Sequence, residues 1–297
     1  MDAMKRVEQA LAAATEQALV AAVAHTEGPG CPPRLAAAIR YAVFPGGARI
    51  RPRLCLAVAC ACGEDDPGIA DAAAASIELL HCASLVHDDL PCFDDAPTRR
   101  GKPSVHHAFG ERLAVLAGDA LIVLAFQTLA RGVACAPHRL VPLLLTISRS
   151  VGMPSGIVAG QAWECENRVA LTDYQRAKTG SLFAAATLAG AAAAGVESEP
   201  WRTLGERLGE AYQVADDLRD VAATAEELGK PTGRDVVLGR PSAAGELGID
   251  GAIERLQQLV AEAIDSIPAC SGAAGLRAVI MMEAQRFLPK ELAQRAA

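Results

Sequence analysis

The sequence predicts an all-α protein that folds as one domain over residues 1–297, a helical bundle with its functional site between facing helices. Three observations predict this class. Alanine, a strong helix former and weak strand former, is abundant, while aromatic residues make up only 4% of the chain. Apolar residues recur at helical spacing almost throughout, without a convincing alternating strand pattern. No fixed repeat or low-complexity linker divides the chain.

The periodicity predicts a series of helices, and glycine and proline punctuate the breaks between them, as at Gly28-Pro29-Gly30 and Pro154-Ser155-Gly156. The longest apolar run, Ser181–Val196, is too short and alanine-rich for a membrane span, so we expect a buried helix there and no transmembrane segment. In order, the predicted helices are Asp2–Thr26, Pro33–Val43, Pro52–Cys62, Ile69–Asp88, Glu111–Arg131, Pro137–Val151, Thr172–Gly195, Trp201–Glu227, Gly248–Ile267 and Ala273–Leu288.

Charge and cysteine content restrict the possible partners and compartment. The net charge is −7 and no basic stripe occurs, which argues against nucleic-acid binding but leaves anionic small molecules open. The nine cysteines form no CxxC pair, and most lie in apolar helical patterns, as Cys55, Cys82 and Cys165 do. The N-terminus has an amphipathic rather than a targeting pattern. We therefore expect buried free thiols in a reducing cytoplasm.

Two acidic clusters interrupt apolar helices. The first contains Asp88, Asp89, Asp94 and Asp95, where Pro91 stops the helix and lets the last two turn back. Carboxylates at a helix C-terminus oppose the macrodipole and repel one another, so a cation is needed. The second cluster places Asp216 and Asp220 on one helical face, with Asp217 beside them and Gln213 one turn earlier.

These spacings suit Mg²⁺, which takes one or two protein carboxylates and shares phosphate oxygens. Two facing clusters would hold a diphosphate through several bridging ions. A single such cluster is usually a solvated acidic face. A glycosidase would need sheet or barrel signals that are missing, and a di-iron bundle would need two Glu-x-x-His motifs, of which Glu78-Leu79-Leu80-His81 is the one match.

Basic residues near the clusters favour a phosphate ligand. Arg99 and Arg100 follow the first cluster, and arginine reads phosphate in a bidentate manner. Taken singly, each basic residue would more often be a surface charge, and a lone His81 a core residue. The remaining candidates are Gly47, Arg49 and Arg51 in a glycine-opened turn, Lys178-Thr179 before an apolar stretch, and Lys230 and Arg240 in glycine-marked breaks.

From Gly46 to Pro241 the chain resembles the trans-isoprenyl diphosphate synthases. GGARIRP, HDDLPCFDDAPTRRGKPSVH, LAGDAL, GQAWE, AKTGSLF and YQVADDLRD…LGK stand in that family's order and spacing. The chain is most similar to the bacterial geranylgeranyl diphosphate synthases of carotenoid and bacteriochlorophyll pathways. The resemblance implies a class I isoprenoid synthase bundle with a central active-site cavity, a cytoplasmic homodimer, and several Mg²⁺ ions per site that Mn²⁺ can replace.

The resemblance also implies the roles of individual residues. Asp88, Asp89, Asp94, Asp216, Asp217 and Asp220 would hold Mg²⁺ on the allylic diphosphate, which Arg99, Lys178 and Lys230 would contact. Arg51, Arg100 and His81 would hold isopentenyl diphosphate, with Gly47 and Arg240 further binding residues. Thr179 and Gln213 would present oxygens to the forming cation.

Two departures from the family pattern bear on binding. The family usually has lysine, which would bind isopentenyl diphosphate, where this chain has Ala48. Arg49 or Arg51 would then bind that substrate instead, or its affinity is weaker. Lysine is also usual at Arg234 and Arg240, where charge but not geometry is kept.

The resemblance implies a prenyltransferase that extends dimethylallyl, geranyl and farnesyl diphosphates by ionisation, condensation and proton loss. Bulky residues before the first motif stop growth early in the family; Ala83 and Ser84 are small here, which favours the twenty-carbon product. A farnesyl diphosphate synthase is the alternative. A class I terpene cyclase would change the second aspartate motif, and a non-catalytic partner subunit would not keep both motifs.

Overall fold

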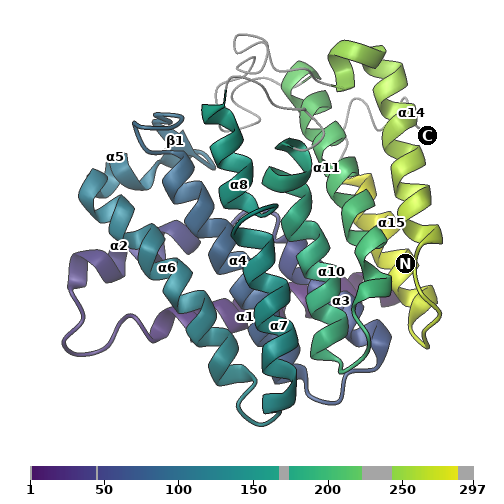
Figure 1. Ribbon diagram of the computed structural model, residues 1–297, viewed down its shortest axis with the longest axis horizontal. Helices are drawn as coiled ribbons and strands as arrows, with labels where there is room; N and C mark the ends of the chain where they lie inside the picture. The colour runs from purple at the N-terminus through teal and green to yellow at the C-terminus, as the bar shows by residue number, and fades with distance from the viewer. Residues whose placement is uncertain (1, 45, 167–173, 223–242, 287–297) are drawn as a thin grey trace.

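The computed structural model describes residues 2–44, 46–166, 174–222 and 243–286, and within these ranges it confirms the all-α class (Figure 1). One two-residue hairpin, β1 (Thr98–Arg99) and β2 (Lys102–Pro103), accompanies the helices. The helices are α1 (Asp2–Ala24), α2 (Pro33–Val43), α3 (Ile50–Cys62), α4 (Pro67–Asp88), α5 (Val105–Phe109), α6 (Glu111–Gly132), α7 (Pro137–Val151), α8 (Ile157–Ala162), η1 (Trp163–Cys165), η2 (Arg176–Gly180), α10 (Ser181–Ala193), η3 (Glu199–Trp201), α11 (Arg202–Ala222), α14 (Ala243–Asp265) and α15 (Ala273–Gln285).

Two helices form the centre of the bundle because they are apolar on all sides. In α10 every residue from Leu182 to Ala193 is buried, and α4 is buried along most of its length. α10 packs against α3, α4, α7 and α11. The missing side chain of Gly190 allows the backbone of α10 to approach the Cys55 carbonyl of α3. Small residues thus give a tightly packed interior from which the ends of α4 and α11 emerge.

α4 and α6 are both long and apolar enough to cross a membrane, judged by length and composition only. α4 is long and apolar because it is a buried core helix. α6 is buried on one side and exposes Val115, Leu116 and Val123 on the other. The absence of a membrane span therefore stays a prediction, and the exposed face of α6 needs an explanation of its own.

Several elements differ from the predicted ones. The predicted helix Thr172–Gly195 contains the π-helix η2 before α10 begins at Ser181, and Thr172 lies outside the described residues. The helix predicted from Gly248 begins at Ala243 and bends at Gly248, where φ is 71°. The short elements α5, α8, β1 and β2 were not predicted, because they are shorter than the window in which periodicity can be detected.

The prediction of buried cysteines is partly wrong. All nine cysteines are free thiols, but only Cys55 and Cys82 are buried. Cys165 is exposed because it ends the 3₁₀ turn η1 instead of lying inside a helix.

Candidate active site

The first acidic cluster lies where α4 ends and the chain folds back on itself. Backbone hydrogen bonds run from the Asp94 amide to the Asp88 carbonyl (3.0 Å) and from the Ala96 amide to the Asp89 carbonyl (3.1 Å). Asp95 takes a left-handed conformation, with φ of 45°. Burial is the main cause that raises the pKa of Asp88 and Asp89, and this turn brings the Asp94 carboxylate close enough to raise both further. The predicted return of the chain toward Asp88 is therefore present.

The carboxylates of this cluster are only partly neutralised by the protein. Burial is the main cause that raises the pKa of Asp88, and the Lys178 ammonium, 3.5 Å from Asp88 Oδ1, offsets part of it. Burial likewise raises the pKa of Asp89, although Arg99 donates from Nε to its Oδ1 at 2.9 Å. A site whose carboxylates stay destabilised in spite of two cations is suited to receive further positive charge.

Lys178 is held by groups that the sequence prediction left without a role. Its Nζ lies 2.5 Å from Glu164 Oε1, and that carboxylate also accepts hydrogen bonds from Tyr174 (2.6 Å) and Gln161 (3.0 Å). Burial lowers the pKa of Lys178, but Asp88, Tyr174 and Glu164 raise it by more, so the ammonium stays charged. The i, i+3 spacing of Gln161 and Glu164 in the GQAWE motif was the available signal.

The π-helix η2 links the first cluster to the second. Whereas Lys178 reaches Asp88 on α4, the hydroxyl of Thr179 donates to Gln213 Oε1 on α11 at 3.1 Å. Gln213 Nε2 then donates to Asp217 Oδ1 at 3.1 Å. Two consecutive residues thus contact the two acidic helices, and both helices run toward the same end of the bundle (Figure 1).

The aspartates of the second cluster lie in different surroundings. Asp216 is half-buried, 3.7 Å from the Arg219 guanidinium. Asp217 is buried, and its Oδ2 accepts a hydrogen bond from the Ala243 amide at the start of α14 (2.8 Å). The backbone of Asp220 lies one turn beyond Asp216 in α11, while its side chain is outside the described part of the chain.

The two arginines of the hairpin contact different groups. Arg100 and Gly101 form the turn, both with positive φ (55° and 74°), as two-residue hairpin turns require. Arg99 pairs with Asp89, whereas the Arg100 guanidinium packs over Gly47, where a Cβ would collide with it. Lys102 donates to the Tyr41 and Phe44 carbonyls (2.9 and 2.8 Å), which fixes the hairpin to α2.

Arg51 is a buried cation in contact with aromatic rings. Its guanidinium lies 4.6 Å from the Phe183 ring centroid and 5.6 Å from that of Tyr212. Its Nε is buried without a hydrogen-bond partner, and burial lowers its pKa. Burial and the neighbouring arginines Arg51 and Arg100 lower the pKa of His81 well below its usual value, so its neutral Nε2 faces Arg51 at 3.5 Å. A buried cation with an unpartnered Nε is suited to bind an anion.

Arg49 serves the interior of the protein. It donates to Glu16 (2.8 Å), to Glu78 (2.7 Å) and to the Val43 carbonyl (2.7 Å), and it is buried. With φ of 51° it forms the turn into α3. The structure therefore engages the Arg49 guanidinium with carboxylate and carbonyl groups of the protein. Lys230, Arg234 and Arg240 lie outside the described residues.

A cavity of about 380 Å³ extends from Asp88 into the bundle. Ala83 and Ser84 line it on α4, one turn before Asp88, and Phe93 and Gln161 also line it. Most of its other lining side chains are apolar, and Ile122, Val151 and Ile157 line it from α6, α7 and α8. A second hollow of about 300 Å³ is lined by Gln213 and Asp217. The first cavity can accommodate an apolar chain whose polar end lies at the first acidic cluster.

The donor set fits hard divalent cations. Asp88, Asp94 and Asp216 offer carboxylate oxygens, the ligands that Mg²⁺ prefers. The raised pKa values of Asp88 and Asp89 reflect charge that a bound cation would relieve. Metals that prefer thiolate or imidazole ligands are not favoured at these aspartates, because carboxylate oxygens are hard ligands.

Comparisons with known proteins agree with this geometry. The polyprenyl synthetase family model matches residues 32–273. A geranylgeranyl diphosphate synthase of Cereibacter sphaeroides is 55% identical over 94% of this chain and 97% of its own length. The synthase of the same name from Rhodobacter capsulatus is 52% identical, over 92% and 94%. A geranyltransferase of Helicobacter pylori, solved with magnesium and isoprenyl diphosphate, is 30% identical with a TM-score of 0.81, covering 94% of this chain and 97% of that one.

Proposed function

The chain belongs to the polyprenyl synthetase family, and from this premise we propose that it is a prenyltransferase that makes geranylgeranyl diphosphate from isopentenyl diphosphate and an allylic diphosphate. Farnesyl diphosphate is the last allylic substrate. The observation that carries the proposal is the juxtaposition of three features: an acidic cluster at the mouth of an apolar cavity, a second one joined to it through Lys178 and Thr179, and a buried arginine whose Nε has no hydrogen-bond partner.

The allylic substrate would lie with its tail in the cavity beneath Asp88 and its diphosphate at the two acidic clusters. Asp88, Asp89, Asp94, Asp216, Asp217 and Asp220 are the proposed metal-binding residues. Bound Mg²⁺ supplies Lewis acidity that stabilises the charge on the leaving diphosphate. Lys178 and Arg99 add fixed positive charge at the same place, since both already contact the first cluster.

The C–O bond then breaks and an allylic cation forms at the top of the cavity. The apolar lining excludes water, which would otherwise capture this cation. We assign to the hydroxyl of Thr179 and the amide oxygen of Gln213 the stabilisation of the positive carbon, because these oxygens join the two clusters. The double bond of isopentenyl diphosphate attacks the cation, a C–C bond forms, and a proton is lost.

Isopentenyl diphosphate would bind at Arg51, Arg100, His81 and Gly47. The buried Nε of Arg51 has no hydrogen-bond partner, and the neutral His81 lies beside the same guanidinium, so an anion is suited to this position. Gly47 leaves room for Arg100, so the glycine-rich turn shapes this position. Arg49 takes no part, because Glu16 and Glu78 engage it. Arg51 and Arg100 therefore bind isopentenyl diphosphate in place of the lysine that is usual at the position of Ala48.

Product length would be set by Ala83 and Ser84. Both line the cavity and neither is bulky, which favours a twenty-carbon chain over the fifteen-carbon alternative. Lys230 and Arg240, outside the described residues, keep their proposed contacts with diphosphate. Residues 1–297 would form one polyprenyl synthetase domain, located in the cytoplasm, and its product would serve carotenoid synthesis.

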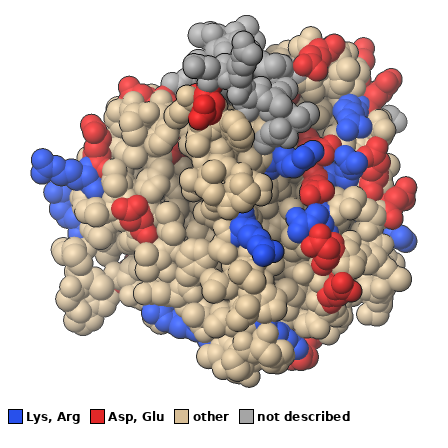
Figure 2. All heavy atoms as spheres, in the orientation of Figure 1, with Lys and Arg blue, Asp and Glu red and all other residues tan. Residues whose placement is uncertain are grey.

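A homodimer accounts for the exposed face of α6 and α7. Val115, Leu116 and Val123 on α6 and Val141 and Leu145 on α7 are exposed. Figure 2 shows a largely uncharged surface over these helices. A second copy of the chain would cover this surface, as expected for an apolar patch of this kind.

The test is an assay of the purified chain with Mg²⁺, labelled isopentenyl diphosphate and each allylic primer in turn. The proposal predicts a labelled twenty-carbon diphosphate from all three primers. Consumption of the primer without isopentenyl diphosphate would identify a cyclase instead. The absence of turnover with every primer would support a non-catalytic subunit.

A further inference from the structure

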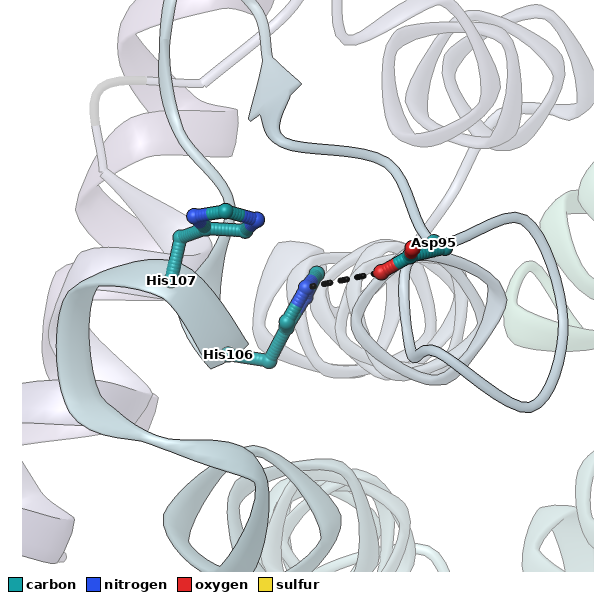
Figure 3. Close-up of side chains that lie close together, drawn as sticks. All are labelled: Asp95, His106 and His107. Carbon is teal, nitrogen blue, oxygen red and sulfur yellow. Dashed lines mark ion pairs between the residues drawn. The ribbon is translucent and has the colours of Figure 1, made fainter.

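A further group of possible metal ligands combines Asp95, the last residue of the first acidic cluster, with two imidazoles. Asp95, His106 and His107 each offer one ligand atom, and these atoms all lie within 4.8 Å of one another (Figure 3). Asp95 comes from the loop after α4, and the two imidazoles come from α5. We propose that these three residues form a Zn²⁺ site that fastens the acidic loop to α5.

The burial of the His106 imidazole supports the metal site independently of the distances. The His106 side chain is only 6% exposed, and its Nε2 is buried without a hydrogen-bond partner, 3.7 Å from Asp95 Oδ1. A buried polar atom that lacks a partner indicates a ligand. In Figure 3 the His106 ring is directed at the Asp95 carboxylate. The open side of the cluster is formed by His107 and Asp95, which are exposed.

The other nitrogen of His106 is already fixed. Ser104, itself buried, lies with its hydroxyl 3.0 Å from His106 Nδ1. When Nδ1–H donates to this hydroxyl, the lone pair of Nε2 faces the cluster, which is the arrangement seen for histidine ligands held by a neighbouring oxygen. The two imidazole rings lie 4.5 Å apart, edge to face, so His107 needs only a side-chain rotation to join.

Two imidazoles and one carboxylate suit Zn²⁺ better than Mg²⁺. Zinc takes nitrogen and oxygen ligands at about 2.0–2.2 Å, and three protein ligands leave a fourth position for water. Ligand atoms around such an ion are about 3.3–3.5 Å apart, so the exposed side chains must close by roughly 1 Å. The site is therefore chemically distinct from the all-carboxylate clusters.

Asp95 follows Asp94 directly, and backbone hydrogen bonds from the amides of Phe93, Asp94, Asp95 and Ala96 fold this loop back onto the end of α4. A metal ion between Asp95 and α5 would restrain this loop without occupying the Mg²⁺ ligands. The site would be a regulatory or stabilising one, and its existence does not depend on the function proposed above.

Zn²⁺ binding to the full chain can be measured by calorimetry in excess Mg²⁺, which fills the all-carboxylate sites. The wild-type chain is expected to bind one Zn²⁺ ion. His107→Ala should weaken this binding by at least about tenfold, while His138→Ala, which removes an exposed imidazole from α7, should leave it unchanged. Zn²⁺ should also slow amide exchange in residues 91–97 of the wild-type chain and not of His107→Ala.

Two outcomes would overturn the proposal. One is the absence of Zn²⁺ binding in excess Mg²⁺. The other is equal affinity in the wild-type chain and His107→Ala. Because His107 is exposed, this variant should fold, and His106→Gln provides a second test of the buried ligand. Because these experiments measure Zn²⁺ binding and not turnover, a negative result would not contradict the proposed enzyme activity.

Discussion

At the scale of single residues, the site contains charges that the folded protein does not fully satisfy. Arg51 is buried against two aromatic rings with its Nε unpaired, and Asp88 stays destabilised by burial despite Lys178. Such groups reduce stability and are retained where a ligand completes them. Each can be tested by a substitution that removes the charge and keeps the size.

Arg51→Met should raise the KM for isopentenyl diphosphate by about tenfold to a hundredfold, because one charge-assisted contact is lost. The KM for the allylic substrate should change much less, since Arg99 and Lys178 are the cations that contact the first acidic cluster. Steady-state kinetics with each substrate varied in turn measures both values. Lys5→Met, which removes an exposed cation from α1, is the control. Equal changes in both KM values would contradict the assignment.

Asp88→Asn should stabilise the metal-free protein while it abolishes most activity. Burial and Asp94 raise the pKa of Asp88, so its ionised form disfavours folding at neutral pH. In chelator at pH 7 we expect a Tm increase on the order of 1–3 °C. This gain should shrink as the pH falls toward the raised pKa, since the wild-type carboxyl then protonates. Asp119→Asn, on the exposed side of α6, should show no gain, and a lower Tm for Asp88→Asn would refute the interpretation.

At the scale of elements, the helices and the two acidic clusters could be predicted from sequence, and the short elements could not. Long apolar periodicity identified α4, α6 and α7 with nearly correct bounds. The hairpin β1–β2 was missed because Arg100-Gly101 is not a common turn pair, and its left-handed Arg100 is set by tertiary packing over Gly47. The role of Glu164 was missed for a similar reason, since its partner Lys178 lies in another element.

The cavity could be predicted only in part. Ala83 and Ser84 were identified on α4, but the walls from α6, α7 and α8 depend on how those helices pack, which periodicity does not determine. The different contacts of Arg49 and Arg51 also follow from packing. Two arginines in one turn look equivalent in sequence, and the hydrogen bonds of Arg49 to Glu16, Glu78 and the Val43 carbonyl distinguish them.

Ala83→Phe should shorten the product from twenty to fifteen carbons or fewer. Its ring would enter the cavity one turn before Asp88, where the growing chain passes. Chromatography of dephosphorylated products measures the length. Cys60→Phe adds the same ring at an exposed position of α3 and should leave the product unchanged. An unaltered product from Ala83→Phe would show that another surface limits chain growth.

At the scale of the whole molecule, the bundle leaves one apolar face uncovered. Val123 of α6 is 56% exposed and Val141 of α7 is 60% exposed. Val123→Glu should convert a dimer into a monomer in light scattering, because a charge would be buried between two copies. Val20→Glu, at a similarly exposed position of α1 (48%), should remain dimeric. A wild-type chain that is already monomeric would remove the homodimer from the account.

The most direct test of the account is whether the two acidic clusters share metal ions around one diphosphate. A crystal of the chain with Mn²⁺ and a non-cleavable allylic diphosphate analogue would show this by anomalous scattering. We predict Mn²⁺ peaks between Asp88 and Asp216, with the analogue's tail along Ala83 and its diphosphate near Lys178. Peaks confined to one cluster, or a diphosphate bound away from both, would contradict the central claim.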